Sequence, residues 1–335
     1  MNATLAVALG LSLATAPSFA LVTYGSPHQY EVAAVGGTPW SLFDGVAHLV
    51  LTDAEGEASA CSGAVLWSGG HLLTAAHCLY DTVLGFEAVS ASIHLPALGF
   101  STTVAVDRRL AHHDWTGDVS QGYDLAVIPL GTQVAAGYGI DRTGVGMFNL
   151  GTDDPPYLLM AGYGLSGSGA LDGTLYPAGT LRAGFNQYDA LWTDVPRAPY
   201  KFDFDDYTAA HNATGRNGTG FIPGYGEHWV EVDWDFSGDP VRGEAMIAPG
   251  DSGGPSFLDS ILVGIHSFIN TSAADGDAVI NASFGEVAAD TRVFLYADWI
   301  DARVAGAVPE PEAGWLMLAG MAGLWARRRQ RSASI

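Results

Sequence analysis

Glycines recur along almost the whole chain and set a narrow limit on its fold class. The 43 glycines are scattered between short apolar runs and form no single repeat. Glycine favours turns over long helices, because its backbone reaches conformations that other residues rarely adopt. Hydrophobic residues make up 48% of the chain and charged residues only 15%, so there is enough apolar surface for a core. These properties predict a turn-rich all-β protein and argue against helical bundles or disorder.

Short runs of β-type residues lie between the turn residues, at the spacing of hairpins rather than of strand–helix–strand crossovers. The expected strands span residues 47–52, 63–67, 72–75, 102–106, 124–130, 157–161, 229–234, 261–268 and 293–295. From Leu295 to Ala305, apolar residues recur at helical intervals, so we expect a short helix there. A chain of 335 residues can bury a core large enough for two packed halves.

The charge balance excludes one class of partner. The chain has 36 acidic and 14 basic residues, a formal net charge of -22. Four of the basic residues lie close to the C-terminal end, so the rest of the chain is more acidic still; they are Arg327, Arg328, Arg329 and Arg331. A surface of this charge repels polyanions, which makes nucleic acid a poor candidate partner.

The first 20 residues have the pattern of a signal peptide. An apolar stretch from Leu5 to Ala16 is followed by Pro17 and by the small-x-small sequence SFA at 18–20. Cleavage after Ala20 is therefore expected. The alternative is a short buried segment, because the stretch before the apolar run contains no Lys or Arg.

The C-terminal segment, residues 306–335, combines three ordered features. They are the sequence VPEP at 308–311, an apolar run at 313–326 and the arginine cluster. Together they resemble the PEP-CTERM sorting signal of Gram-negative bacteria. The apolar run is shorter than the roughly 20 residues that a bilayer-spanning helix needs, so we expect a transient, processed membrane anchor. The arginines would remain cytoplasmic, which places the body outside the cytoplasm; the alternative is an amphipathic terminal helix.

Three further segments carry residues suited to acyl transfer by a serine. They read TAAHC at 74–78, YDLAVIPL at 123–130 and GDSGGP at 250–255. A serine hydroxyl is a weak nucleophile, so Ser252 needs a base such as His77 to take its proton. A buried carboxylate, here Asp124, would orient the imidazole and stabilise its protonated form. Taken alone, Ser252 could lie in an ordinary turn and His77 in the core, but all three segments in order argue against coincidence.

These segments resemble those of the chymotrypsin-like serine protease family, and the order His77, Asp124, Ser252 is that of chymotrypsin. Further similar segments lie at 34–37, 162–164, 262–267 and 290–300, so the resemblance covers about residues 34–305. Little aligns between Gly184 and Phe236, where we expect an insertion. The resemblance implies two six-stranded antiparallel β-barrels, with the catalytic triad between them and a short C-terminal helix.

The same resemblance assigns roles around the nucleophile. The backbone NH groups of Gly250 and Ser252 would form the oxyanion hole. Asp251 would form an ion pair with an amino terminus freed at Ala34, which makes residues 21–33 a propeptide. The remaining histidines, including the pair at 112–113 and His266, are interpreted as surface or packing residues.

The resemblance also locates a specificity pocket. Its base would be Met246, and its walls would come from Ser267, Phe268, Ile269 and Ala288. A cationic side chain buried against Met246 would lose its water and gain no partner. We therefore expect cleavage after small or medium apolar residues, with Ile269 narrowing the pocket, and poor cleavage after Lys or Arg.

Cys61 and Cys78 are the only two cysteines in the chain. An even count in an exported chain suggests one disulfide, and the resemblance implies the same pair.

The suspected insertion is rich in aspartate, with Asp203, Asp205 and Asp206 close together. Carboxylates at such spacings could ligate calcium. No EF-hand pattern is present, and acidic clusters commonly face water, so a solvated loop is favoured over a metal site. No cofactor is predicted.

The sequence thus predicts a secreted serine endopeptidase that acts on protein or peptide substrates through an acyl-enzyme. Its expected location is periplasmic, cell-surface or extracellular in a Gram-negative bacterium. Sorting machinery that recognises the VPEP segment would be a second partner. The alternative is a catalytically silent, protease-like protein that binds at the cell surface or in the matrix.

Overall fold

The computed structural model describes residues 21–23, 41–147, 150, 156–170, 172–206, 208–215, 244–275 and 279–306. The chain divides into one unit that ends at Leu295 and a second that begins at Tyr296. The expected signal peptide at 1–20 lies outside the described residues, and so does the expected sorting segment at 306–335 apart from Gly306.

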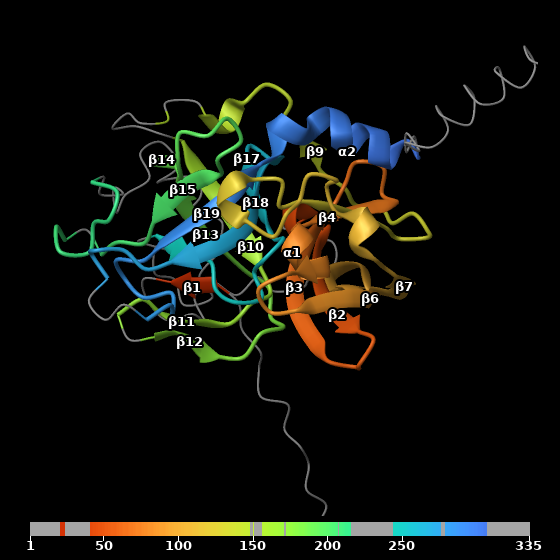
Figure 1. Ribbon diagram of the computed structural model, residues 1–335, viewed down its shortest axis with the longest axis horizontal. Coiled ribbons are helices and arrows are strands. Elements are labelled where there is room, and N and C mark those ends of the chain that lie inside the picture. The colour runs from red at the N-terminus through yellow and green to blue at the C-terminus, as the bar shows by residue number, and fades with distance from the viewer. Residues whose placement is uncertain are drawn as a thin grey trace, which may run out of the picture. The chain divides into compact units, whose positions relative to one another are not determined.

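The first half of the larger unit is a curled antiparallel sheet of seven strands, drawn in orange in Figure 1. Burial alternates along strand β2, where Ala47, Leu49 and Leu51 are fully buried, as expected for a strand with one face on a core. In spatial order the strands are β5 (Tyr80–Asp81), β6 (Phe86–Leu95), β2 (Val46–Asp53), β3 (Ala58–Val65), β4 (His71–Thr74) and β8 (Ala126–Pro129), while β7 (Phe100–Ala105) pairs with β6.

The second half is an eight-stranded sheet, antiparallel apart from one short edge strand, drawn in green to blue in Figure 1. Its order is β13 (Arg182–Gln187), β10 (Tyr157–Gly162), β17 (Pro255–Leu258), β18 (Ile261–Asn270), β19 (Val287–Arg292), β15 (Tyr200–Asp203) and β14 (Ala190–Leu191), and β9 (Gly139–Ile140) pairs with β18 in parallel. Large side chains such as Tyr200, Phe202 and Val263 fill its core.

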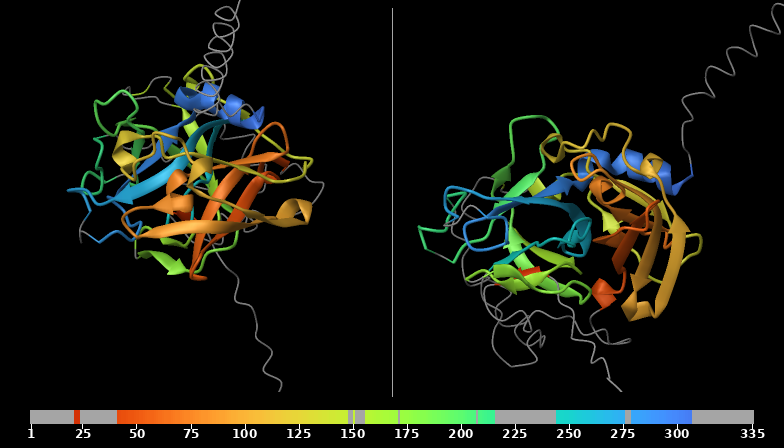
Figure 2. Two further views of the ribbon diagram at one scale, coloured as in Figure 1. Left: turned by 45° about the vertical axis from the view of Figure 1, so that its right-hand side comes forward. Right: turned by 60° about the horizontal axis from the view of Figure 1, so that its bottom comes forward.

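A small third sheet has four strands and joins distant parts of the chain. Its order is β12 (Asp172–Tyr176), β11 (Ser166–Ser168), β1 (Leu21–Thr23) and β16 (Ala245–Met246). Strand β1 is parallel to β11 and antiparallel to β16. Figure 2 shows this short red strand beside green strands.

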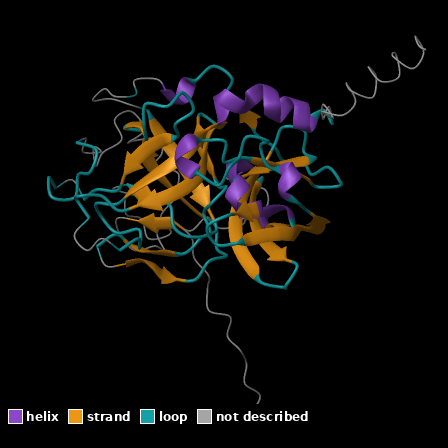
Figure 3. Ribbon diagram, viewed as in Figure 1, coloured by secondary structure: helices purple, strands orange, loops and turns teal. Residues whose placement is uncertain are grey.

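The helices of the described part of the chain are short, as Figure 3 shows. The α-helices are α1 (Ala76–Leu79) and α2 (Ala297–Val304). The 3-10 turns are η2 (Ser41–Phe43), η3 (Pro96–Leu98), η4 (Arg108–Leu110), η5 (Val119–Gln121), η6 (Val145–Met147) and η7 (Val293–Tyr296). Within the described ranges, no helix has the length and apolar character that a membrane crossing requires.

The predicted all-β fold and the predicted C-terminal helix are confirmed. The strand predicted at 293–295 is wrong: β19 ends at Arg292, and the next residues form the 3-10 turn η7. A short apolar run fits a buried helical turn as well as a strand, so periodicity could not separate the two. The strand predicted at 229–234 lies outside the described residues. Within the suspected insertion, β13, β14 and β15 belong to the second sheet.

Candidate active site

Pairing between β4 and β8 brings His77 and Asp124 together. Helix α1 begins two residues after β4, and Asp124 lies two residues before β8. The strands β4 and β8 pair in antiparallel orientation. The Nδ1 atom of His77 lies 2.8 Å from Oδ2 of Asp124, and the His77 backbone NH donates to Oδ1 at 2.9 Å. The carboxylate therefore fixes both the ring and the main chain of the histidine.

The environment of Asp124 favours its charged form. The side chain is fully buried, and the Ser267 hydroxyl also donates to Oδ2. Burial alone would raise the pKa of this carboxyl, but the charge of His77 and the hydrogen bonds from His77 and Ser267 hold the pKa below its usual range. Sequence reasoning placed Ser267 in the pocket wall and missed this bond, because nothing local marks its partner.

The pKa of His77 is shifted in the opposite direction. Burial disfavours the imidazolium, but the charge of Asp124 and its hydrogen bond outweigh burial and raise the pKa of His77 above its ordinary value. The side chain keeps 18% of its surface exposed. An imidazole that is oriented on one side and accessible to solvent has the properties of a general base.

The loop that carries Ser252 is tied to the first sheet through Ser62. The Ser62 backbone NH donates to the Ser252 carbonyl at 2.8 Å, and the Ser62 hydroxyl donates to the Gly250 carbonyl at 2.9 Å. The predicted disulfide between Cys61 and Cys78 is present. The Sγ atom of Cys78 lies 3.6 Å from the Ser252 carbonyl oxygen. The backbone of Ser252 is therefore held against the residue that follows His77.

Glycines shape this loop for physical reasons. Gly250 and Gly253 have φ angles of 98° and 82°, which side chains disfavour. A Cβ atom on Gly253 would lie 2.0 Å from Thr74 Oγ1, so the close approach itself requires glycine. The backbone NH groups of Gly250 and Ser252 donate to no hydrogen bond among the described residues. Two neighbouring amides without an internal acceptor suit an oxyanion hole.

Asp251 is fully buried and organises the same loop. Its Oδ1 accepts a hydrogen bond from Gly164 N at 2.7 Å, and its Oδ2 accepts one from Ala248 N at 2.8 Å. Burial raises the pKa of Asp251 to about 6, against these backbone bonds. The backbone NH of Leu21 also donates to this carboxylate. The structure thus gives Asp251 the partner Leu21, whereas Ala34, the expected partner, lies outside the described residues.

A second buried His–Asp pair lies behind the loop and was missed in the sequence. The Nδ1 atom of His266 lies 2.9 Å from Oδ1 of Asp290, and both side chains are fully buried. The His266 backbone accepts a hydrogen bond from Gly253 N and donates one to Gly254 O. Of the two interpretations of His266, as a surface or as a packing residue, the structure supports packing, and this packing is specific. Only the pairing of β18 with β19 brings the two residues together.

The expected pocket residues have three different surroundings. Ile269 and Ala288 are direct cross-strand partners on β18 and β19, so these two predicted wall residues are neighbours. Phe268 packs edge-on against Trp192, with ring centroids 4.6 Å apart. Met246 is fully buried within the core of the second half.

The acidic cluster is not the solvated loop that the sequence favoured. Asp203 and Asp205 are buried and lie with Glu244 so that one oxygen of each is within 4.8 Å of the others. The backbone NH groups of Ala213 and Thr214 donate to Asp203 Oδ2, which explains how this carboxylate tolerates burial. Burial, together with the neighbouring carboxylates, raises the pKa of Glu244 well above its usual value.

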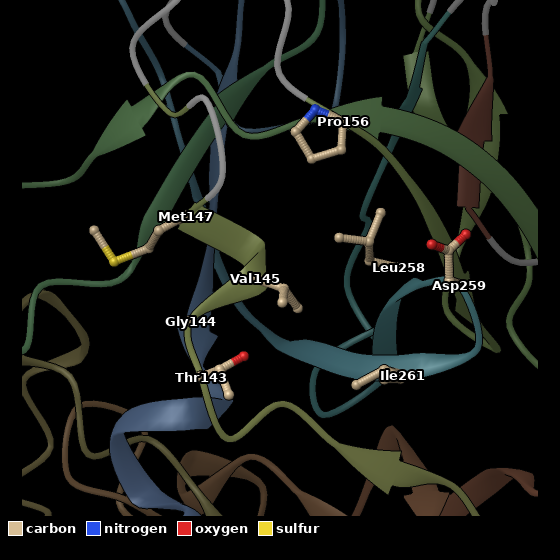
Figure 4. Close-up of a pocket in the computed structure, with 8 residues that line it drawn as sticks. All are labelled: Thr143, Gly144, Val145, Met147, Pro156, Leu258, Asp259 and Ile261. Carbon is tan, nitrogen blue, oxygen red and sulfur yellow. The ribbon is translucent and has the colours of Figure 1, made fainter. Parts of the chain in front are cut away.

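One open pocket of about 630 Å³ lies apart from the residues above (Figure 4). The turn η6 and the β17–β18 turn supply most of its lining. Its apolar side chains are Val145, Met147, Pro156, Leu258 and Ile261. No residue of the predicted active site lines it.

Comparisons with known proteins give a structural relative only. No protein-family profile and no curated protein matches the chain. Among 424 matching chains of solved structures is HL collagenase, with a TM-score of 0.51 and 18% identity. The match covers 82% of this chain and 97% of the collagenase chain. Identity this low concerns the fold alone, and we conclude that the chain has the fold of the chymotrypsin-like serine proteases.

Proposed function

We propose that the protein is an exported serine endopeptidase with His77, Asp124 and Ser252 as its catalytic triad. One observation carries the proposal. The buried His77–Asp124 pair, with the imidazole partly exposed, lies next to the disulfide against which the Ser252 backbone is held. An oriented base beside a serine on a glycine-rich turn is the arrangement that acyl transfer requires.

The reaction follows from the roles of these groups. The Ser252 Oγ attacks the carbonyl carbon of the substrate while His77 Nε2 takes the hydroxyl proton. Charge develops on the carbonyl oxygen, where the NH groups of Gly250 and Ser252 would stabilise it. The C–N bond then breaks, His77 gives its proton to the leaving amine, and an acyl-enzyme remains. Water repeats the sequence and regenerates Ser252.

Specificity for apolar residues before the scissile bond is part of the proposal. The base position holds Met246 and offers no carboxylate to a substrate cation. Ile269, opposite Ala288, leaves less room than a glycine would. A peptide library read by mass spectrometry tests this. Dominant cleavage after Lys or Arg would overturn the argument from Met246, and dominant cleavage after Phe or Tyr would overturn only the narrowing by Ile269.

Export and sorting also remain proposals, supported by the signal-peptide pattern and by the PEP-CTERM-like end. The substrates would be proteins or peptides outside the cytoplasm. The processing machinery would recognise the VPEP sequence at 308–311.

Covalent labelling with a fluorophosphonate tests the catalytic proposal against a catalytically silent binding protein. We expect one label per chain in the wild type and in the control Ser101→Ala, which replaces an exposed serine. We expect no label in Ser252→Ala. Labelling that persists in Ser252→Ala, or that is absent from processed wild type, would refute a serine protease mechanism.

A further inference from the structure

Tyr123, the residue before Asp124, has a backbone conformation that its side chain disfavours. Its φ angle is 65°, in the left-handed region that residues other than glycine rarely adopt. A hydrogen bond tightens the same bend: the Leu125 backbone NH donates to the Tyr123 carbonyl at 2.8 Å and closes a three-residue turn around Asp124. The direction in which the Asp124 side chain leaves the main chain therefore depends on Tyr123.

Strained backbone persists only where its surroundings hold it in place. Two contacts hold the ring of Tyr123. The ring of His112 lies against it, with centroids 5.1 Å apart, and the guanidinium carbon of Arg197 lies 5.3 Å from its centre. A cation within about 6 Å of an aromatic centroid is attracted to the ring. Arg197 therefore stabilises the position of Tyr123 from a distant part of the chain.

The loop that carries Arg197 is fixed at two points. Arg197 Nη1 donates to the Leu295 carbonyl at 2.9 Å, and Arg292 Nη2 donates to the Pro196 carbonyl at 2.6 Å. The loop connects β14 to β15, within the suspected insertion, where the sequence shows little resemblance to the chymotrypsin-like proteases. An arginine whose head group is already held by a carbonyl loses little further freedom when it covers a ring.

A change of backbone at Tyr123 would affect His77. Asp124 accepts hydrogen bonds from Nδ1 and from the backbone NH of His77, at 2.8 Å and 2.9 Å. Relaxation of Tyr123 to a negative φ angle would rotate the main chain before Asp124 and lengthen these bonds. The charge and the hydrogen bond of Asp124 raise the pKa of His77, so their weakening would lower that pKa.

We propose that Arg197 is a positioning residue of the catalytic site. By covering Tyr123, it maintains the left-handed turn that directs the Asp124 carboxylate at His77. It acts through Tyr123 and Asp124 and takes no part in the chemistry itself. This inference rests on the proposed function, in which Asp124 orients the general base.

The test replaces Arg197 by methionine, which keeps an unbranched side chain and removes the cation. The matched control is Arg142→Met, because the guanidinium carbon of Arg142 also lies 5.3 Å from a ring centre, that of Trp67. Neither of these two residues belongs to the predicted active site. Arg197→Lys restores a cation and should recover part of any loss.

With Ser252 intact, Arg197→Met should slow fluorophosphonate labelling by about tenfold, because a displaced carboxylate orients the imidazole less well. The acid limb of the pH profile of labelling should move to lower pH, since His77 loses part of the interaction that raises its pKa. Arg142→Met should change neither. An unchanged rate in Arg197→Met, or a slower rate with an unmoved acid limb, would overturn the positioning role.

A second variant, Tyr123→Gly, tests the strain directly. Glycine adopts a left-handed φ angle without steric cost and leaves no ring for Arg197 to hold. In this background, Arg197→Met should therefore change the labelling rate by less than about twofold. A tenfold effect that persists without the ring would show that Arg197 acts by another route, contrary to the proposal.

Proton NMR of the Ser252→Ala protein gives a readout that does not require activity. A proton between histidine Nδ1 and a buried carboxylate resonates at low field, and His77 and His266 both have such a partner. Arg197→Met should shift or broaden the His77 resonance, while the His266 resonance stays unchanged and shows that the protein is folded. An unchanged His77 resonance would overturn the proposal. A changed resonance, with no fluorophosphonate labelling of the protein with Ser252 intact, would refute the protease function while leaving the positioning of His77 supported.

Discussion

Replacement of Asp290 by asparagine tests whether the second His–Asp pair stabilises the loop around Ser252. The Asp290 carboxylate is fully buried and accepts a hydrogen bond from His266 Nδ1. The His266 backbone in turn forms hydrogen bonds with Gly253 and Gly254, which follow the nucleophile. The substitution keeps the shape of the side chain but removes its charge and one acceptor atom.

The size of the effect follows from the donors that face this carboxylate. They are His266 Nδ1 at 2.9 Å, the Tyr188 hydroxyl at 2.6 Å and the Ser256 hydroxyl. A hydrogen bond to a charged group contributes about 1.5–3 kcal/mol and a neutral one about 0.5–1.5 kcal/mol. The loss of charge therefore costs about 1 kcal/mol for each of three bonds, or about 3 kcal/mol in all.

Urea denaturation in the Ser252→Ala background measures this loss in the free energy of unfolding. The matched control is Asp118→Asn, because Asp118 is exposed and caps the turn η5 by accepting hydrogen bonds from the backbone NH and the hydroxyl of Ser120. We expect the control to lose less than about 1 kcal/mol. With Ser252 intact, Asp290→Asn should also slow fluorophosphonate labelling. An unfolding free energy within about 0.5 kcal/mol of the control would refute the reasoning.

Three other changes test the site. Asp124→Asn should lower kcat by about 10⁴-fold. It should also move the acid limb of the pH profile of kcat/KM to lower pH, because the charge that raises the His77 pKa is lost. An acid limb that does not move would show that it reports the titration of another group. Because the pKa of His77 is raised in the folded state, its protonation stabilises the fold below about pH 6.5, and this stabilisation is lost as pH rises through the folded-state pKa. Asp124→Asn should therefore lower the free energy of unfolding more at about pH 6 than at about pH 9, as measured by urea titrations. Joint replacement of Cys61 and Cys78 by alanine should cost about 3 kcal/mol in unfolding free energy, for a closed loop of 17 residues; equal urea midpoints would contradict this. Ile269→Gly should raise cleavage after Phe relative to Ala by about tenfold in a peptide library, and an unchanged preference would show that Ile269 does not line the pocket.

The sequence by itself determined the features that depend on local chemistry and on short periods. Short β-type runs between turn-forming glycines were sufficient to predict an all-β fold, because such runs have the length and the boundaries of strands rather than of helices. The Cys61–Cys78 disulfide followed from a count of two cysteines. The His77 and Asp124 segments could be recognised because general-base chemistry restricts residue types within a few positions.

Only the tertiary structure decided which distant residues meet. The pairing of Asp251 with Leu21, the bond from Ser267 to Asp124 and the burial of Asp205 beside Glu244 all join residues from different strands or loops. A periodic pattern shows which face of a strand is buried but does not identify the partner across the core. Charge clusters are ambiguous for the same reason, since one run of carboxylates can face water or be buried against backbone amides. The physical reason is that hydrogen bonding and desolvation depend on the atoms that packing brings within about 3 Å, whatever their separation along the chain.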